Sequence, residues 1–264
     1  MDSSNRLNDR PRVLITGASS GIGAQLAKDY LEDGWQVFGC GRNRERLVAI
    51  KGINPLIFDI GVRDAVQSAG KQLKKLLGEN TLDLIILNAG TCEYIEAPLQ
   101  FDDQLFERVI HTNLVAVGYC LNAFLPFLSH DGRLALMSSS SIYLALPRAE
   151  AYGSSKAAIN YLAATLDASF AGHKESEHIR VSVICPGFVD TPLTEKNDFP
   201  MPMRVDVHTA SKEIRLGLAK GKREIHFPKR FTCLLKLLSI LPAGVWRKIT
   251  LAMAPENKNK DAEL

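Results

Sequence analysis

Tyr152 and Lys156 are spaced as Tyr-x-x-x-Lys in the stretch Ala-Tyr-Gly-Ser-Ser-Lys-Ala-Ala-Ile. Four residues make about one turn of a helix, so the two side chains share a face if the segment is helical. A phenol ordinarily titrates near pH ~10, and a nearby ammonium lowers that pKa because it stabilises the phenolate. The spacing therefore favours a tyrosine that exchanges a proton with a carbonyl or alcohol oxygen. Because the same spacing occurs by chance on many helix surfaces, the interpretation depends on partners elsewhere in the chain.

A serine is the first such partner. Ser139 lies in the serine run 138–141, directly after the apolar segment 133–137, which predicts a strand. A hydroxyl at the end of a strand in a doubly wound sheet faces the site and can hold the reacting oxygen by a hydrogen bond. Ser138 and Ser140 are adjacent alternatives, and the run could also be a plain turn.

A glycine-rich loop near the N-terminus reads Thr16-Gly17-Ala18-Ser19-Ser20-Gly21-Ile22-Gly23. It lies between an apolar run, 12–16, and an amphipathic stretch, 22–32, in the order strand, turn, helix. Glycine permits the tight turn and the close approach of a pyrophosphate, and the N-terminus of a helix attracts the anion. The residues expected to bind the cofactor here are Gly17, Ser19, Ser20, Gly21, Ile22 and Gly23.

The end of the second predicted strand, 35–40, indicates which nicotinamide cofactor is used. An Asp or Glu that holds a free ribose 2′-hydroxyl usually stands near this point. Here the sequence is Gly41-Arg42-Asn43-Arg44 instead, and arginine suits a 2′-phosphate through a charge-assisted contact. Arg42 therefore favours NADP(H) over NAD(H), with Arg44 as a second candidate. The competing interpretation is that these arginines and Arg46 form the solvated start of a helix.

With these motifs the chain resembles the short-chain dehydrogenase/reductase family over about residues 11–230. Further segments fit, because each follows a predicted strand: Asp59 and Ile60, then Asn88-Ala89-Gly90, then Pro186-Gly187, Val189 and Thr191. The resemblance implies that Asp59 meets the adenine ring and that the Asn-Ala-Gly element lines the adenine-ribose side. It also implies that the stretch from 186 to 191 holds the nicotinamide carboxamide and the diphosphate.

The resemblance further implies a catalytic tetrad of Asn113, Ser139, Tyr152 and Lys156. In the family the asparagine kinks a helix and carries a proton-relay water, and the tyrosine protonates the carbonyl oxygen as hydride arrives. The lysine also hydrogen-bonds the nicotinamide ribose. Ser20 departs from the many NADP-preferring relatives that carry a basic residue at this position, which puts more weight on the arginine at 42 for cofactor choice.

The expected substrate is a small apolar carbonyl or alcohol compound. The loop 190–203, which covers the substrate in relatives, carries Leu193, Phe199, Met201 and Met203, and the segment 144–147 would face it. We therefore expect NADPH-dependent reduction of an apolar aldehyde or ketone. Two alternatives remain open: a membrane-surface reductase of lipid metabolism, and a redox sensor that binds NADP(H) without turnover.

The chain as a whole predicts one α/β domain. Its 264 residues are 46% hydrophobic and 23% charged, an ordinary composition for a single large core. Apolar runs predict strands at 12–16, 35–40, 55–58, 82–87, 133–137, 179–184 and 224–227, and helical patterns lie between them at 22–33, 43–50, 62–77, 101–128, 152–171 and 207–220. This alternation predicts a doubly wound Rossmann fold with about seven parallel strands and helices on both faces.

Several classes of site are not expected. Five scattered cysteines without a C-x-x-C motif and six histidines without an H-x-x-x-H motif predict free thiols and no metal. The polar first twelve residues indicate no secretory signal, no apolar run is long enough for a membrane span, and no nucleic-acid-binding module is recognisable. The expected location is cytoplasmic, and the family resemblance implies a homodimer or homotetramer.

The C-terminal segment 228–255 predicts an apolar and basic helical extension. Residues 204–248 contain eleven Lys or Arg and three Asp or Glu, so positive charge gathers at this end. An apolar helix with basic flanks and a tryptophan is typical of a helix at a membrane surface. The competing interpretation is a pocket lid or subunit contact whose apolar face packs on protein. The terminal segments 1–10 and 256–264 are expected to be flexible.

Overall fold

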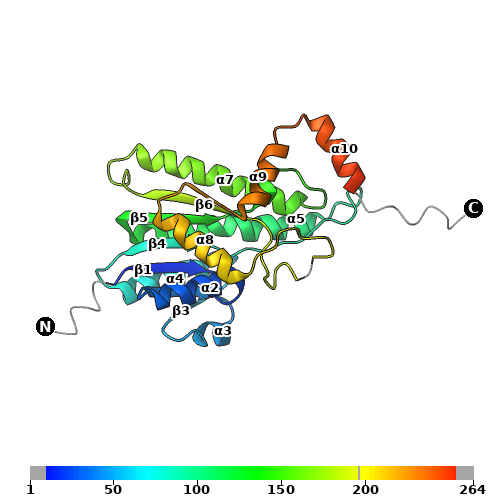
Figure 1. The fold of residues 1–264 in the computed structure, drawn as a ribbon. Coiled ribbons are helices and arrows are strands. Elements are labelled where there is room, and N and C mark those ends of the chain that lie inside the picture. The colour runs from blue at the N-terminus through cyan, green and yellow to red at the C-terminus, as the bar shows by residue number, and fades with distance from the viewer. Residues whose placement is uncertain (1–9, 196, 254–264) are drawn as a thin grey trace, which may run out of the picture.

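The computed structural model describes residues 10–195 and 197–253. In these residues the chain forms a seven-stranded sheet, drawn in Figure 1, in the order β3-β2-β1-β4-β5-β6-β7. The strands are β1 Arg12–Thr16, β2 Gln36–Gly41, β3 Asn54–Ile57, β4 Leu82–Leu87, β5 Leu128–Met137, β6 Arg180–Pro186 and β7 Glu224–Phe227. All neighbouring strands are parallel, and the order reverses between β1 and β4. The predicted doubly wound Rossmann fold is confirmed, and its ligand crevice is expected at the carboxyl ends of these two strands.

Helices cover both faces of the sheet. They are α2 Gly21–Glu32, α3 Arg44–Val48, α4 Arg63–Leu77, α5 Asp103–Ile110, α6 Ala116–Phe124, α7 Glu150–Ala171 and α8 Val207–Ala219. One core layer packs α2 and α8 on the sheet, and the other packs α4, α6 and α7 on the opposite face. In β1 the side chains of Val13 and Ile15 enter the first layer and that of Leu14 enters the second, because successive strand residues point to opposite faces.

A π-helical turn, His111–Val115, interrupts the long helical segment between α5 and α6. This turn contains Asn113, the residue at which a helix kink is expected, and the asparagine is buried in it. By length and composition the segment Asp103–Phe127 could cross a membrane. Its first part packs on α7 and its second part on α4, so it is a helix of this core.

The start of β5 differs from the prediction. The helix predicted to run to residue 128 ends in the 3₁₀ turn Leu125–Phe127, which contains Pro126, and β5 begins at Leu128 instead of 133. Leu128 pairs with β4, and the register then shifts before the pairing resumes. The exposed polar residues within this irregular stretch interrupt the apolar pattern that would have indicated the longer strand.

The predicted C-terminal extension forms two helices, α9 Lys229–Leu238 and α10 Ala243–Met253. Figure 1 shows them at one corner of the molecule, with α10 standing away from the sheet. Because α9 begins directly after β7, the two helices lie at the end of the sheet where the strand carboxyl ends meet. The segments expected to be flexible lie outside the described residues, apart from Arg10.

Candidate active site

A cavity of about 1110 Å³ opens at the carboxyl ends of the strands. The predicted residues that line it are Gly17, Ser19, Ser20, Gly21, Ile22, Arg42, Asp59, Ile60, Asn88, Ala89, Gly90, Ser139, Tyr152, Lys156, Pro186, Gly187, Val189 and Thr191. Gly23 and Asn113 do not line the cavity but contact residues that do. Sequence positions spread over more than 170 residues thus meet in one hollow.

The glycine turn forms one wall of the cavity. Gly17 and Gly21 have φ values of +69° and +53°, a region that favours glycine. A Cβ on Gly23 would stand 2.3 Å from the Gly17 carbonyl oxygen, so α2 can approach the turn only without a side chain there. The Ser20 side chain does not cap α2, which leaves the N–H groups of the first helical turn available to an anion. These features fit a diphosphate.

Replacing Gly23 with Ala is expected to disrupt the anion site formed by the glycine turn and the N-terminus of α2. The new methyl group would collide with backbone at the Gly17 oxygen and with Asn88 Nδ2, at 2.6 Å, and the turn would have to move. We expect NADPH binding, measured by fluorescence titration, to weaken by at least about a hundredfold, because a misplaced turn loses several charge-assisted hydrogen bonds.

Gly118→Ala is the matched control, since a Cβ built on this glycine of α6 meets no described atom within 4 Å beyond its chain neighbours and the backbone of its own helix. It should leave NADPH binding unchanged and stabilise the helix by about 1 kcal/mol. Retained NADPH affinity in Gly23→Ala would show that the close packing of α2 on the turn is not required for binding.

Hydrogen bonds that involve side chains bridge the ends of β1 and β4, where the strand order reverses. Asn88 Nδ2 donates to the Thr16 carbonyl oxygen over 3.0 Å. The backbone N–H groups of Asn88 and Ala89 donate to Thr16 Oγ1 over 3.0 and 3.1 Å. The Asn-Ala-Gly element is therefore fastened to the glycine turn, and both walls of the cavity keep a fixed spacing.

At the end of the cavity next to β2 and β3, an arginine contacts an acidic residue. Arg42 Nη1 lies 3.5 Å from Asp59 Oδ2, and the Arg42 side chain is 79% exposed. The other oxygen of Asp59 accepts the Gly61 N–H over 2.9 Å, which fixes the carboxylate. Arg44 does not line the cavity, because it begins α3 and faces solvent. Of these two arginines, Arg42 is the one that lines the cavity.

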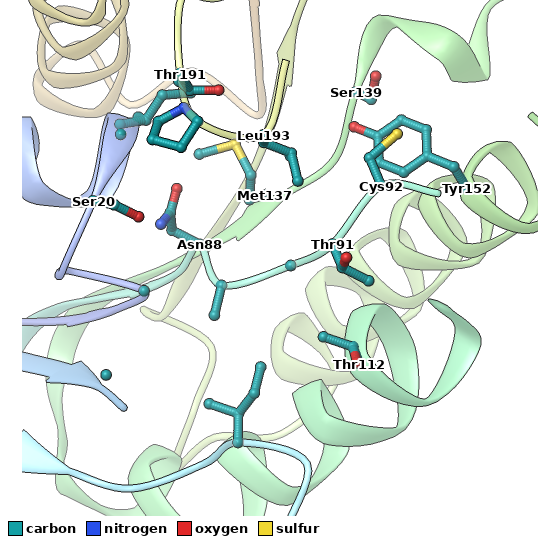
Figure 2. A pocket seen from close by; sticks show the side chains of 18 of the residues that line it. Ser20, Asn88, Thr91, Cys92, Thr112, Met137, Ser139, Tyr152, Thr191 and Leu193 are labelled. Atoms are coloured by element: carbon teal, nitrogen blue, oxygen red, sulfur yellow. The ribbon is translucent and has the colours of Figure 1, made fainter. Parts of the chain in front are cut away.

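At the opposite end, Ser139 and Tyr152 converge. Figure 2 shows the Tyr152 hydroxyl on the side of its ring that faces Ser139, with the Cys92 sulfur beside the ring. Ser139 Oγ accepts the Ser141 N–H over 3.1 Å and keeps its own proton, which it can donate. Ser138 instead donates its hydroxyl to the Lys156 carbonyl oxygen over 3.1 Å. Among the three serines considered, Ser139 is the one placed beside the tyrosine.

Lys156 does not act on Tyr152 in the way that the spacing suggested. Its Nζ lies 5.7 Å from the centre of the phenol ring and donates to the Met137 carbonyl oxygen over 3.0 Å. Burial raises the pKa of Tyr152, and the hydrogen bond from Ser139 offsets only part of that rise. Burial also lowers the pKa of Lys156 to about 8. The expected lowering of the phenol pKa is wrong for this geometry, because desolvation outweighs the distant ammonium.

Asn113 forms hydrogen bonds next to the end of the cavity where Ser139 and Tyr152 lie. Its Nδ2 donates to the Thr91 carbonyl oxygen and to Ser155 Oγ, both over 2.9 Å, and its Oδ1 accepts the Thr91 N–H over 2.8 Å. A Cβ on Gly90 would stand 3.0 Å from Asn113 Oδ1 and 3.3 Å from Lys156 Nζ. The asparagine thus links the loop after β4 to α7. It and Lys156 both lie next to Gly90.

Several lining residues were missed by sequence reasoning. They include Thr91, Cys92 and Glu93, which follow the Asn-Ala-Gly element, and Arg108 and His111. The first three could have been found by extending the strand-end argument by three residues. Arg108 pairs with Glu93 over 3.0 Å, and this contact depends on how α5 packs, for which the sequence carries no signal.

The predicted apolar wall is only partly present. Leu193 lines the cavity, and Phe199 packs edge-on against Tyr94, with ring centres 5.3 Å apart. Met203 is about half exposed, so its expected place in the wall is wrong. Arg148 ties the loop down through Asp198, at 3.0 Å, and stacks on the Tyr94 ring.

Comparisons with known proteins bear on the family and the fold of this chain. A family model described as short chain dehydrogenase matches residues 11–200. An uncharacterized oxidoreductase of Myxococcus xanthus is 30% identical over 240 residues, which cover 87% of this chain and 92% of that protein. Benzil reductase ((S)-benzoin forming) of Saccharomyces cerevisiae is 28% identical over 266 residues, with 94% and 92% covered. A short chain dehydrogenase of Burkholderia cenocepacia, crystallised with NADP, has a TM-score of 0.78 at 23% identity and covers 94% of this chain and 99% of its own.

Proposed function

Because the chain belongs to the short-chain dehydrogenase family, we propose that it is an NADPH-dependent oxidoreductase that reduces an apolar aldehyde or ketone. One observation carries the proposal: Ser139, Tyr152 and Lys156 line the same cavity as the glycine turn and Arg42. A proton donor and a phosphate cradle in one hollow suit transfer between a nicotinamide and a carbonyl compound.

The cavity fits NADPH by its donor groups. The glycine turn and the N-terminus of α2 would hold the diphosphate, Arg42 the 2′-phosphate, and Asp59 the adenine end. Lys156 would hold the nicotinamide ribose. NADPH, when bound, supplies the hydride that reduces the carbonyl carbon. The NADP complex of the Burkholderia relative supports the choice of cofactor.

Tyr152 and Ser139 handle the oxygen of the substrate. Because burial raises the pKa of Tyr152, the phenol keeps its proton at neutral pH and can give it to the carbonyl oxygen. The hydroxyl of Ser139 donates a hydrogen bond to the same oxygen and stabilises the charge that develops there. A protonated phenol at neutral pH favours the reductive direction.

The activity should fall at alkaline pH as Lys156 loses its charge. With its pKa lowered to about 8, the ammonium is charged below this pH and neutral above it. We expect kcat/KM for reduction to be level below that point and to fall by about tenfold per pH unit above it, as a single proton leaves. Tyr152 stays protonated over this range because its own pKa is raised.

The pH profile of Lys156→Arg tests this assignment. A guanidinium keeps its charge throughout the range, so any residual activity should lack the alkaline fall. An alkaline fall that persists unchanged in Lys156→Arg would assign it to another group.

A substrate panel tests the proposed function directly. Loss of NADPH absorbance is measured with benzil, long-chain aliphatic aldehydes and apolar ketones, and with small polar carbonyl compounds for comparison. Benzil is included because the yeast relative is a benzil reductase, and the aromatic contacts of Tyr94 and Phe199 near the cavity suit such a ring. Faster turnover of the apolar compounds is expected.

The redox-sensor alternative makes the opposite prediction. A protein that binds NADP(H) without turnover would bind the cofactor and leave the whole panel unreduced. The presence of both Tyr152 and Lys156 at the cavity supports the enzyme over the sensor. A homodimer or homotetramer, also proposed, would be detected by sedimentation velocity.

A further inference from the structure

The two C-terminal helices present apolar side chains to solvent. The exposed ones are Leu234, Leu237, Ile240, Leu241 and Val245, from α9, the turn and α10, and we call this set the hairpin surface. The two helices that carry it lie at one corner of the molecule in Figure 1. Clustered exposed apolar residues with charged neighbours mark an interaction site, whereas single ones need no explanation.

The hairpin surface is not a poorly packed piece of core, because the other side of the hairpin is firmly attached. Phe231 and Leu235 are buried with Leu144 and pack against Phe188. Trp246 Nε1 donates to the Ala145 carbonyl oxygen over 2.8 Å. α9 therefore has one apolar face against the protein, while Leu234 and Leu237 leave a second apolar face exposed.

The charge on the hairpin has one sign. Residues 229–253 contain five basic residues, Lys229, Arg230, Lys236, Arg247 and Lys248, and no Asp or Glu. Lys236 pairs with Glu224 in β7, while the other four are exposed. Exposed leucines with cations around them are the arrangement that binds at an anionic lipid surface.

We propose that the hairpin surface docks on an anionic membrane, with its apolar side chains among the lipid headgroups and its four exposed cations at the phosphates. A second copy is a poor occupant, because a two-fold contact would set this basic surface against itself. The negative charge of a lipid surface complements it. Docking in this sense does not depend on the proposed reaction.

Docking would also bring the active site close to the membrane. Phe231, on the attached face of α9, stands directly behind Gly187, since a Cβ on that glycine would lie 2.9 Å from its ring. Gly187 lines the catalytic cavity. If the proposed function holds, the membrane is then the source of an apolar carbonyl substrate that partitions into lipid.

Co-sedimentation with vesicles tests the docking. The full chain, without substrate, is mixed with vesicles of phosphatidylcholine alone or of equimolar phosphatidylcholine and phosphatidylglycerol. Binding is expected only to the anionic vesicles and should be lost at high salt. Arg247→Gln combined with Lys248→Gln should weaken binding by about 25-fold, since each cation near such a surface contributes about fivefold.

A matched pair of leucine variants isolates the apolar contact. Leu234 in the hairpin surface and Leu216 on α8 are both 46% exposed. Leu234→Glu should weaken vesicle binding by at least about tenfold. The change removes an apolar side chain that the lipid would bury, and it adds a carboxylate that the anionic headgroups repel. Leu216→Glu should bind as the unchanged chain does. Equal losses in the two variants would overturn the proposal.

A probe on Cys233 gives a readout in which all five residues of the hairpin surface are kept. This thiol is exposed and lies one helical turn from Leu237. A polarity-sensitive dye attached to it, in a Cys92→Ser background, should shift to the blue with anionic vesicles. No shift and no sedimentation, together with a dimer that Leu234→Glu dissociates in sedimentation velocity, would make this face a subunit contact and overturn the proposal.

Discussion

Replacing Tyr152 with Phe is expected to lower kcat for carbonyl reduction by at least about a thousandfold, within the range that a positioned general acid contributes. The phenol hydroxyl lies beside Ser139 in the cavity, and burial raises its pKa so that it holds the proton to be transferred. Phenylalanine keeps the ring and its packing and removes only the donor. The affinity for NADPH should therefore stay nearly unchanged when measured by fluorescence titration.

Tyr161→Phe is the matched control for this change. Tyr161 lies on the same helix, α7, but is 75% exposed, so removal of its hydroxyl should alter neither kcat nor NADPH affinity. Retained turnover in Tyr152→Phe would remove this residue from the proposed proton transfer and leave Ser139 as the remaining hydroxyl beside it.

The carboxyl ends of parallel strands explain why so much of the candidate site could be predicted. The glycine turn, Arg42, the Asn-Ala-Gly element and Ser139 follow four different strands, and these strand ends meet at one edge of a doubly wound sheet. Each motif was recognisable locally, and topology alone brings the motifs together. Strict alternation of strands and helices with right-handed connections limits the fold to a doubly wound arrangement, while the strand order comes from the structure.

The pKa shifts and the contacts that depend on burial could not be predicted from the sequence. The spacing of Tyr152 and Lys156 predicts a shared face, but the direction in which each pKa moves is set by desolvation inside the folded chain. The contact of Arg108 with Glu93 depends likewise on the packing of α5. Sequence reasoning left the C-terminal extension open between a helix packed on protein and a membrane helix. In the structure, one face of α9 packs on the protein through Phe231, and Leu234 on another face is exposed.

Arg42→Asp is expected to reverse the cofactor preference. The guanidinium stands at the edge of the cavity, largely exposed and 3.5 Å from Asp59, where a 2′-phosphate would replace or join that contact. Removing a charge-assisted hydrogen bond and setting two carboxylates against a phosphate should lower kcat/KM for NADPH by at least about a hundredfold. NADH has no such phosphate, and an acid at the end of β2 can accept its ribose hydroxyl, so kcat/KM for NADH should rise.

Arg44→Asp separates this local contact from a general change of charge. It makes the same substitution two residues further on, at the exposed first position of α3, where an acid suits the helix dipole and does not line the cavity. The ratio of kcat/KM for NADPH to that for NADH should fall steeply in Arg42→Asp and hardly change in Arg44→Asp. Equal shifts would mean that net charge governs cofactor choice at long range. An unchanged ratio in both would mean that the 2′-phosphate is held elsewhere in the cavity.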